Sequence, residues 1–165
     1  MVLQKKQSRL LLFDDNYAQQ WNFVPGSIDR GDSLKVVKGN EELNIKLCGI
    51  AAPEIEQPLG IESRDYLRLL IDKSNGTIHI LPIEENELKS FVAEAWIPIK
   101  PDYEGQIHLN TAMVEAGMAW HYEKYSGNCE SAENLTWAEK IAREDKLGVW
   151  NDSHQEPWKW QKANQ

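Results

Sequence analysis

The chain has 165 residues, of which 41% are hydrophobic and 27% charged, and its formal net charge is −8. These values are typical of one globular domain with a sizeable core, and no apolar run reaches the roughly 20 residues that a membrane span needs. The negative net charge disfavours tight, sequence-independent binding to nucleic acid, because such binding relies on basic groups that neutralise phosphates. A local basic patch is still compatible with a negative net charge.

Composition divides the chain into three regions. Residues 1–20 are polar and irregular and predict an N-terminal arm or one extra edge element. Residues 21–150 predict a folded domain, and residues 151–165 form a Trp-rich C-terminal tail. The apolar stretch 10–13 is shorter than the core of a signal peptide and is followed at once by Asp14 and Asp15. For the sequence as given we therefore expect no export signal and a cytoplasmic location.

Short runs of alternating apolar and polar residues predict five β-strands. Turn signals at Gly31 and at residues 38–40 separate the first three of them. The predicted strands are Phe23–Ile28, Ser33–Lys38, Leu43–Leu47, Thr77–Ile83 and Ser90–Ile99.

Three helices are predicted between and after these strands. The first begins at Pro58 and is closed by Asn75-Gly76, the second has Asn110 as its N-cap, and the third is capped by Ser131 and ends near Gly148. The order of three strands, one helix, two strands and two helices predicts an α+β fold. It matches a five-stranded OB-type Greek-key β-barrel with three packed helices.

The chain has two cysteines, Cys48 and Cys129, so only one intramolecular disulfide can form. Two cysteines in a cytosolic protein are usually free, buried thiols, and we expect this state. A Cys48–Cys129 disulfide stays open as the alternative. It would indicate a compartment more oxidising than the cytosol, such as that of an exported mature form.

Five short segments carry motifs in a specific order, from about residue 23 to residue 150. The first contains Gly31-Asp32-Ser33 and the second ends in Pro53-Glu54; the five segments are Ile28–Lys35, Lys46–Glu54, Phe91–Glu94, Leu109–Ala119 and Lys146–Trp150. The first two resemble the motifs Asp-Gly-Asp-Thr, here with one inserted residue, and Arg-Leu-x-x-Ile-Asp-x-Pro-Glu of the staphylococcal nuclease (thermonuclease) family. This resemblance implies the staphylococcal nuclease-like fold.

The resemblance also implies a chemistry and a set of site residues. Members of this family are expected to cut phosphodiester bonds with one Ca²⁺, which two carboxylates and a backbone carbonyl hold, while a glutamate activates water and two arginines grip the phosphate. By resemblance Asp32 is a metal carboxylate, the carbonyl of Ala52 is a metal ligand, Glu54 is the general base, and Lys46 replaces the first arginine.

Besides Lys46, two further positions depart from the family pattern. Ala51 stands where the second metal carboxylate belongs, and Ser90 stands where the second arginine belongs, with Lys89 one residue away and expected on the opposite strand face. An arginine that stabilises the transition state is worth on the order of 10³–10⁵ in rate, and lysine does not replace its bidentate grip. Because Ala51 replaces a carboxylate ligand, Ca²⁺ would bind weakly at best.

These departures favour a divergent family member with an incomplete active site. We expect its Ca²⁺-dependent phosphodiesterase activity to be lost or strongly weakened, and the domain to act as a binding or scaffold module for a protein partner or for weak nucleic-acid contact. The alternative is an active nuclease that hydrolyses DNA or RNA with Asp32 and Glu54, and with Lys46 as a substitute cation.

Structural roles compete with each of these assignments. Asp32 can stabilise the turn beside Gly31, Glu54 can be a solvated residue at a helix start, and Lys46 can lie along the barrel surface.

The aromatic residues near the C-terminal end also leave alternatives open. Tyr122 and Tyr125 can stack on a nucleic-acid base or pack against the helices, and packing is favoured. Trp137 is expected in a packed position. The tail segment 158–160 can strap back over the barrel, which is favoured, or anchor a partner protein.

Overall fold

The computed structural model describes residues 18–99 and 105–165 of the chain. The predicted first helix is present as α2, and two single-turn 3₁₀ helices, η1 and η2, lie near the C-terminal end. In chain order the elements are β1 (Gln19–Phe23), β2 (Ser33–Lys38), β3 (Glu41–Leu47), β4 (Ile50–Ala51), α2 (Gly60–Asp72), β5 (Thr77–Glu87), β6 (Ser90–Pro98), β7 (Gln106–His108), α3 (Leu109–Glu115), β8 (Trp120–His121), η1 (Glu123–Tyr125), α4 (Ala132–Glu144), η2 (Gly148–Trp150) and α5 (Pro157–Ala163).

Five strands close into a mixed β-barrel. The strand order is β3-β2-β1-β5-β6, and the parallel pairing of β3 with β6, which sets Asn44 opposite Ser90, closes the ring. The alternation read from the sequence directs Leu34 and Val36 of β2 into the barrel core, where each is at most 2% exposed. The expected α+β class with a five-stranded OB-type barrel is therefore confirmed.

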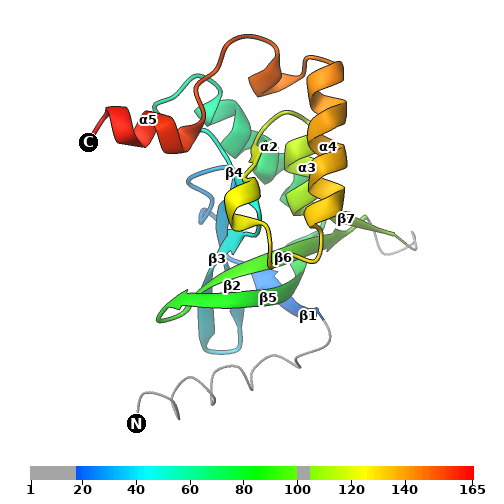
Figure 1. Ribbon diagram of the computed structural model, residues 1–165. Coiled ribbons are helices and arrows are strands. Elements are labelled where there is room, and N and C mark those ends of the chain that lie inside the picture. Colours follow the sequence, from blue (N-terminus) through cyan, green and yellow to red (C-terminus); the bar gives the residue numbers. More distant parts are fainter. Residues whose placement is uncertain (1–17, 100–104) are drawn as a thin grey trace.

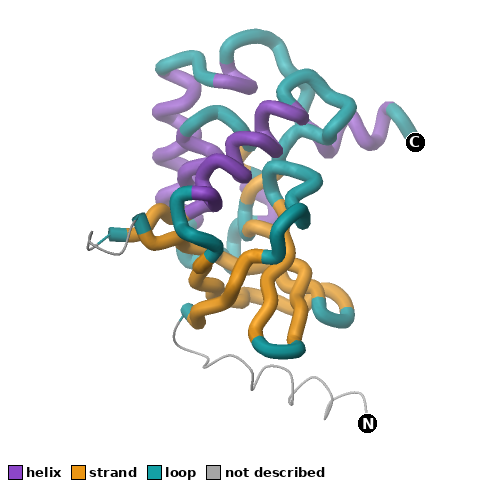
Figure 2. Tube along the Cα trace, turned by 180° about the vertical axis from the view of Figure 1, so that it is seen from behind, coloured by secondary structure: helices purple, strands orange, loops and turns teal. Residues whose placement is uncertain are grey.

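The helices gather at one end of this barrel. Figures 1 and 2 show α2, α3 and α4 stacked together above the strands, with α5 projecting to one side. Leu67 of α2, Leu109 of α3 and Leu135 of α4 are fully buried and belong to the same apolar core as the barrel residues Trp21 and Phe91. No helix in the described ranges has the length and apolar character required to cross a bilayer.

The first predicted strand lies earlier in the sequence than expected. β1 covers Gln19–Phe23, because the chain after it turns: Ser27 donates its backbone N–H to the carbonyl of Val24 at 3.2 Å, and Gly26 has a φ of 77°. The strand thus begins inside the segment assigned to the N-terminal arm, whose residues 1–17 lie outside the described part.

The N-cap of α3 also differs from the prediction. His108 is the N-cap, and Asn110 is buried instead. The Asn110 amide accepts from the backbone N–H of Ala95 at 3.1 Å and donates to the carbonyl of Cys48 at 3.0 Å. A tertiary role, joining β6 to the end of β3, has therefore overridden the local capping preference.

Ser131 precedes α4 as predicted but does not cap it with its side chain, and α4 ends at Glu144 rather than near Gly148. The Ser131 hydroxyl donates instead to the buried carboxylate of Glu94.

The two cysteines form a disulfide, so the expectation of free thiols is wrong. Cys48 at the end of β3 is bonded to Cys129 in the turn before α4, with 5.9 Å between the Cα atoms. Gly49 permits this close approach, because it has a φ of +74° and a Cβ there would lie 2.6 Å from the Leu135 side chain. The disulfide ties the strand that leads into the candidate site to the helical end of the molecule.

Candidate functional site

Asp32 is the centre of the candidate site. Its carboxylate lies at the start of β2 and is fully buried. One oxygen, Oδ2, accepts from the backbone N–H of Ala52 at 2.9 Å and from Nζ of Lys46 at 2.9 Å. The other oxygen, Oδ1, is buried and has no hydrogen-bond partner among the described residues. Asp32 therefore does more than stabilise its own turn, because it joins two distant strands.

The sequence analysis did not identify Arg30, which completes this cluster. Its guanidinium donates to Oε1 of Glu54 at 2.7 Å, to Oδ2 of Asp32 at 3.2 Å and to the carbonyl of Ala52 at 3.1 Å. The loop that carries it packs tightly on α2, because a Cβ on Gly31 would fall on the Ser63 hydroxyl. A gap-free match to Asp-Gly-Asp-Thr would have placed Arg30 at the first aspartate of the motif.

Glu54 is held by the turn that leads into α2. Its backbone N–H donates to the side-chain oxygen of Gln57 at 2.8 Å, and the backbone N–H of Gln57 donates back to its carbonyl at 2.9 Å. The carboxylate is thereby presented to Arg30, and it also accepts from the Gln161 amide. This arrangement leaves Glu54 a shielded partner of cationic and amide donors rather than a freely solvated turn residue.

The remaining predicted positions fall around this cluster. Lys46 of β3 is 43% exposed and pairs with Asp32, so it does not merely lie along the barrel surface. Ala51 of β4 is 6% exposed and offers only a methyl group. Ser90 begins β6, and Lys89 lies in the preceding turn with a φ of 63°, not on a strand face.

The cluster does not fit a calcium ion. Ca²⁺ takes about six to eight oxygen ligands. Of the oxygens that the resemblance assigns to the metal, the Arg30 guanidinium contacts Oδ2 of Asp32 and the carbonyl of Ala52, which leaves Oδ1 of Asp32. Within the described ranges no three Asp, Glu, His or Cys side chains converge as a metal-holding group. A divalent ion here would face a fixed positive charge and would lack a second carboxylate.

Beside this cluster lies a cavity of about 510 Å³ whose lining includes Lys46, Tyr122, Lys124, Tyr125 and Glu84. The two tyrosine rings meet edge to face, with their centroids 4.7 Å apart. Tyr125 is 61% exposed. A cavity with aromatic faces and two lysines provides groups suited to binding a planar, anionic or polar ligand.

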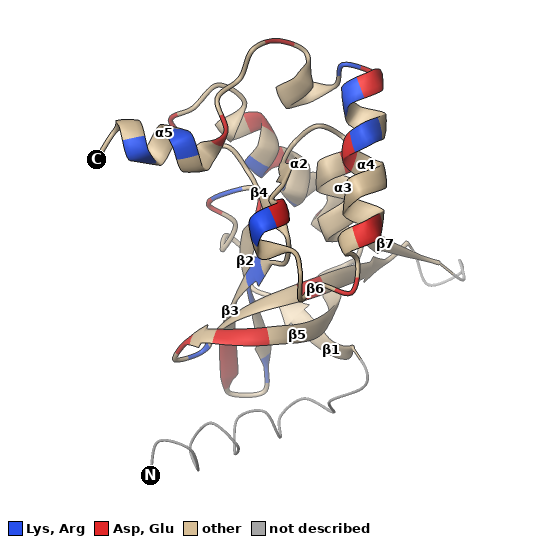
Figure 3. Cartoon of the chain, viewed as in Figure 1, with Lys and Arg blue, Asp and Glu red and all other residues tan. Residues whose placement is uncertain are grey.

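The charges around this cavity have mixed signs. Figure 3 shows acidic residues along the second half of β5, which contains Glu84, Glu85 and Glu87. It shows both basic and acidic residues along α4. Glu84 is itself part of the cavity wall. Against this single carboxylate the wall carries two lysines, Lys46 and Lys124, so the charge of the cavity wall is mixed.

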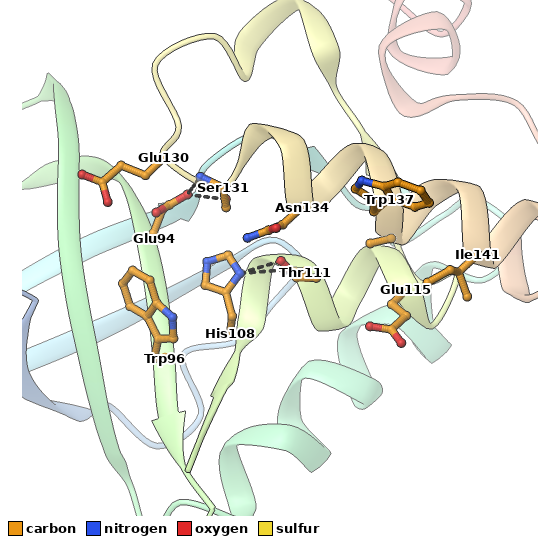
Figure 4. A pocket seen from close by; sticks show the side chains of 11 residues that line it. Glu94, Trp96, His108, Thr111, Glu115, Glu130, Ser131, Asn134, Trp137 and Ile141 are labelled. Atoms are coloured by element: carbon orange, nitrogen blue, oxygen red, sulfur yellow. Dashed lines mark hydrogen bonds between the residues drawn. The ribbon is translucent and has the colours of Figure 1, made fainter.

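A second cavity of about 520 Å³ lies between β6, α3 and α4, and none of the cluster residues line it (Figure 4). Glu94 accepts there from the backbone N–H of Ser131 at 2.7 Å. The ring of His108 contacts Trp96, and its Nδ1 lies 2.6 Å from the Thr111 hydroxyl oxygen. Burial lowers the pKa of His108 to about 4, so this imidazole is neutral near pH 7.

Comparisons with known proteins identify the family to which this fold belongs. The model of the family "Staphylococcal nuclease homologue" matches residues 44–152. The chain is similar to a protein named micrococcal nuclease from Shigella flexneri, with 31% identity over 150 residues that cover 87% of this chain and 84% of the relative. It is also similar to a protein named uncharacterized endonuclease from Escherichia coli O157:H7, with 28% identity, 79% of this chain and 78% of the relative.

A plant relative extends the same likeness. A probable staphylococcal-like nuclease of Oryza sativa subsp. japonica is 31% identical over 82% of this chain, which corresponds to 26% of the plant protein. The bacterial and plant relatives each match about four fifths or more of this chain. On the strength of this match and of the fold that it covers, the chain belongs to the staphylococcal nuclease family.

Proposed function

We propose that this domain is a staphylococcal nuclease-fold binding or scaffold module whose Ca²⁺-dependent phosphodiesterase activity is lost or strongly weakened. The observation that carries the proposal is the contact of the Arg30 guanidinium with Asp32, the Ala52 carbonyl and Glu54. The family is typically Ca²⁺-dependent, and here a side chain of the protein supplies positive charge among the oxygens that a metal would need.

The charge balance of the cluster supports this proposal. Two cations, Arg30 and Lys46, pair with two carboxylates, Asp32 and Glu54, so the group is neutral without a metal. A general base must reach the proton that it removes, but Glu54 is engaged by the guanidinium. Ser90 supplies no guanidinium for the phosphate.

The second candidate is an active nuclease that uses Asp32 and Glu54. It is favoured by the relatives, whose printed names describe nucleases, and by the convergence of Asp32, Glu54 and Lys46 in one cluster. In that case Arg30 would have to release Glu54 and bind the phosphate instead, which is a role suited to a forked donor.

A nuclease assay separates these candidates. Purified protein is incubated with single-stranded DNA and with RNA, with Ca²⁺ or with EDTA, beside a Glu54→Gln variant. We expect no Ca²⁺-dependent cleavage above the level of the Glu54→Gln protein. Efficient cleavage that stops with EDTA and is abolished by Glu54→Gln would establish the nuclease and end the module proposal.

A further inference from the structure

The C-terminal tail folds back onto the candidate site. Helix α5 follows η2 and lies to one side of the other helices (Figure 1), and its first turn carries Trp158. The ring of Trp158 stacks on Tyr122, with centroids 4.3 Å apart and only 5° between the planes, and it meets Trp120 edge to face at 6.4 Å. The tail therefore covers a face of Tyr122 that the sequence analysis offered for base stacking.

Two polar contacts bring the same segment to the turn that holds Glu54. The Gln161 amide of α5 donates to Oε1 of Glu54, and the Gln57 side chain donates to the backbone carbonyl of Gln155 at 2.9 Å. The tail thus presents a ring to Tyr122, a donor to Glu54 and an acceptor to Gln57. These three features are what a docked ligand would use.

The tail is held by side chains rather than by extensive packing. Helix α5 has only seven residues, and Pro157 is its only buried one. A helix this short is marginal by itself in water, so its position depends on the Trp158 and Gln161 contacts. Segments with few buried contacts open at a low free-energy cost compared with the folded core.

We propose that the surface formed by Glu54, Gln57, Trp120 and Tyr122 is a peptide-docking surface, and that α5 is its resident occupant, a strap that masks the site. This inference rests on the proposed function, since it takes the site to be a binding surface. A ligand that needs the free face of Tyr122 and the Glu54 carboxylate must first displace Trp158 and Gln161.

The test uses the full chain and a Trp158→Ala variant, with Trp137→Ala as the matched control. Trp137 lies on α4, is 63% exposed, and its ring is contacted by Lys140 of the same helix. Hydrogen exchange is followed in peptides covering residues 51–57 and 157–164, and binding of a fluorescently labelled synthetic peptide with the sequence of residues 155–165 is measured by anisotropy. Gln161→Ala, which leaves the ring stack in place, is the milder second variant.

For Trp158→Ala we expect faster exchange in both peptides and binding about tenfold tighter, because one ring stack and its coupled hydrogen bond no longer compete. Gln161→Ala should give a smaller gain of about threefold, and Trp137→Ala none.

Unchanged exchange in Trp158→Ala would overturn the docking of α5, and faster exchange with unchanged binding would overturn the masking. Failure of the proposed function is recognised separately, because it appears as Ca²⁺-dependent DNA cleavage by the wild-type chain.

Discussion

Replacing Arg30 by alanine tests whether its guanidinium stands in for a metal. The variant leaves the buried Asp32 carboxylate, whose side chain is 1% exposed, with Lys46 and the Ala52 N–H as its partners. Removing one partner of a buried ion pair lowers the free energy of unfolding by about 3–5 kcal/mol when the other charge is left without a partner. Here a loss of roughly 1–3 kcal/mol is expected, because Lys46 and the Ala52 N–H still donate to Asp32. Urea unfolding should register this loss as a lower midpoint with an unchanged slope.

The second half of this prediction concerns calcium. Without Arg30, the oxygens of Asp32, Ala52 and Glu54 are open to a cation. If they bind Ca²⁺ with a dissociation constant on the order of 1 mM, about 10 mM Ca²⁺ restores about 1.4 kcal/mol. The wild-type chain should gain nothing beyond the general effect of salt, which an equal ionic strength of NaCl measures.

Arg64→Ala is the matched control. The Arg64 side chain is 25% exposed, against 26% for Arg30, but its partner Asp65 is 53% exposed. Exposed pairs contribute roughly 0–1 kcal/mol, so this variant should lose little stability and should not respond to Ca²⁺. The reasoning is refuted if Arg30→Ala loses no more stability than Arg64→Ala, or if Ca²⁺ stabilises the wild type as much as the Arg30 variant.

Three further predictions follow from contacts elsewhere in the fold. Burial lowers the pKa of His108 to about 4, against an ordinary value of 6.5. Between pH 6.5 and pH 4 the imidazole therefore binds a proton in the unfolded chain but not in the folded one. The free energy of unfolding should fall by up to about 3 kcal/mol as the pH drops from 6.5 to 4. Urea unfolding of His108→Gln should lack this part of the pH dependence. The Cys48–Cys129 disulfide closes a sequence separation of 81 residues, so reduction should cost roughly 2–4 kcal/mol, and titration of the denatured, unreduced protein should find no free thiol. Asn110→Ala leaves the Ala95 N–H and the Cys48 carbonyl without their partner, which should cost roughly 2–4 kcal/mol in the same assay, while Asn134→Ala on α4 should cost less than about 1 kcal/mol.

The parts of the fold that follow from local periodicity were predictable from the sequence. The alternation in β2 and β3 needs only neighbouring residues, and the structure reproduces it, whereas α2 begins at Gly60, two residues after the predicted start at Pro58. Asn110 could not be placed in this way, because its side chain bonds to backbone groups 15 and 62 residues away. Local capping preference loses to such contacts when they satisfy buried backbone groups.

The aromatic residues show the same limit. The tail folds back, as the favoured strap requires, but Trp158 stacks on Tyr122 and Gln161 reaches Glu54, so the tail lies against β8 and the turn before α2 and not over the barrel strands. Trp137, which was expected in a packed position, is 63% exposed. Its place on α4 could not be judged from spacing alone, because the outer face of α4 also carries Ile141 at 39% exposure.

The departures from the family motif make physical sense as a set. Asp32 is fully buried at the start of β2, and a buried carboxylate needs a counter-charge or its charged form becomes costly. With Ala51 in place of a second carboxylate, a calcium ion would be held weakly and could not supply that charge dependably. Arg30 supplies it covalently, and its fork spans the oxygens of Asp32, Ala52 and Glu54 at 2.7–3.2 Å. On the proposed function, the Arg30 guanidinium takes the place of the charge that a metal would supply, and the turn around Glu54 keeps its shape without a bound metal.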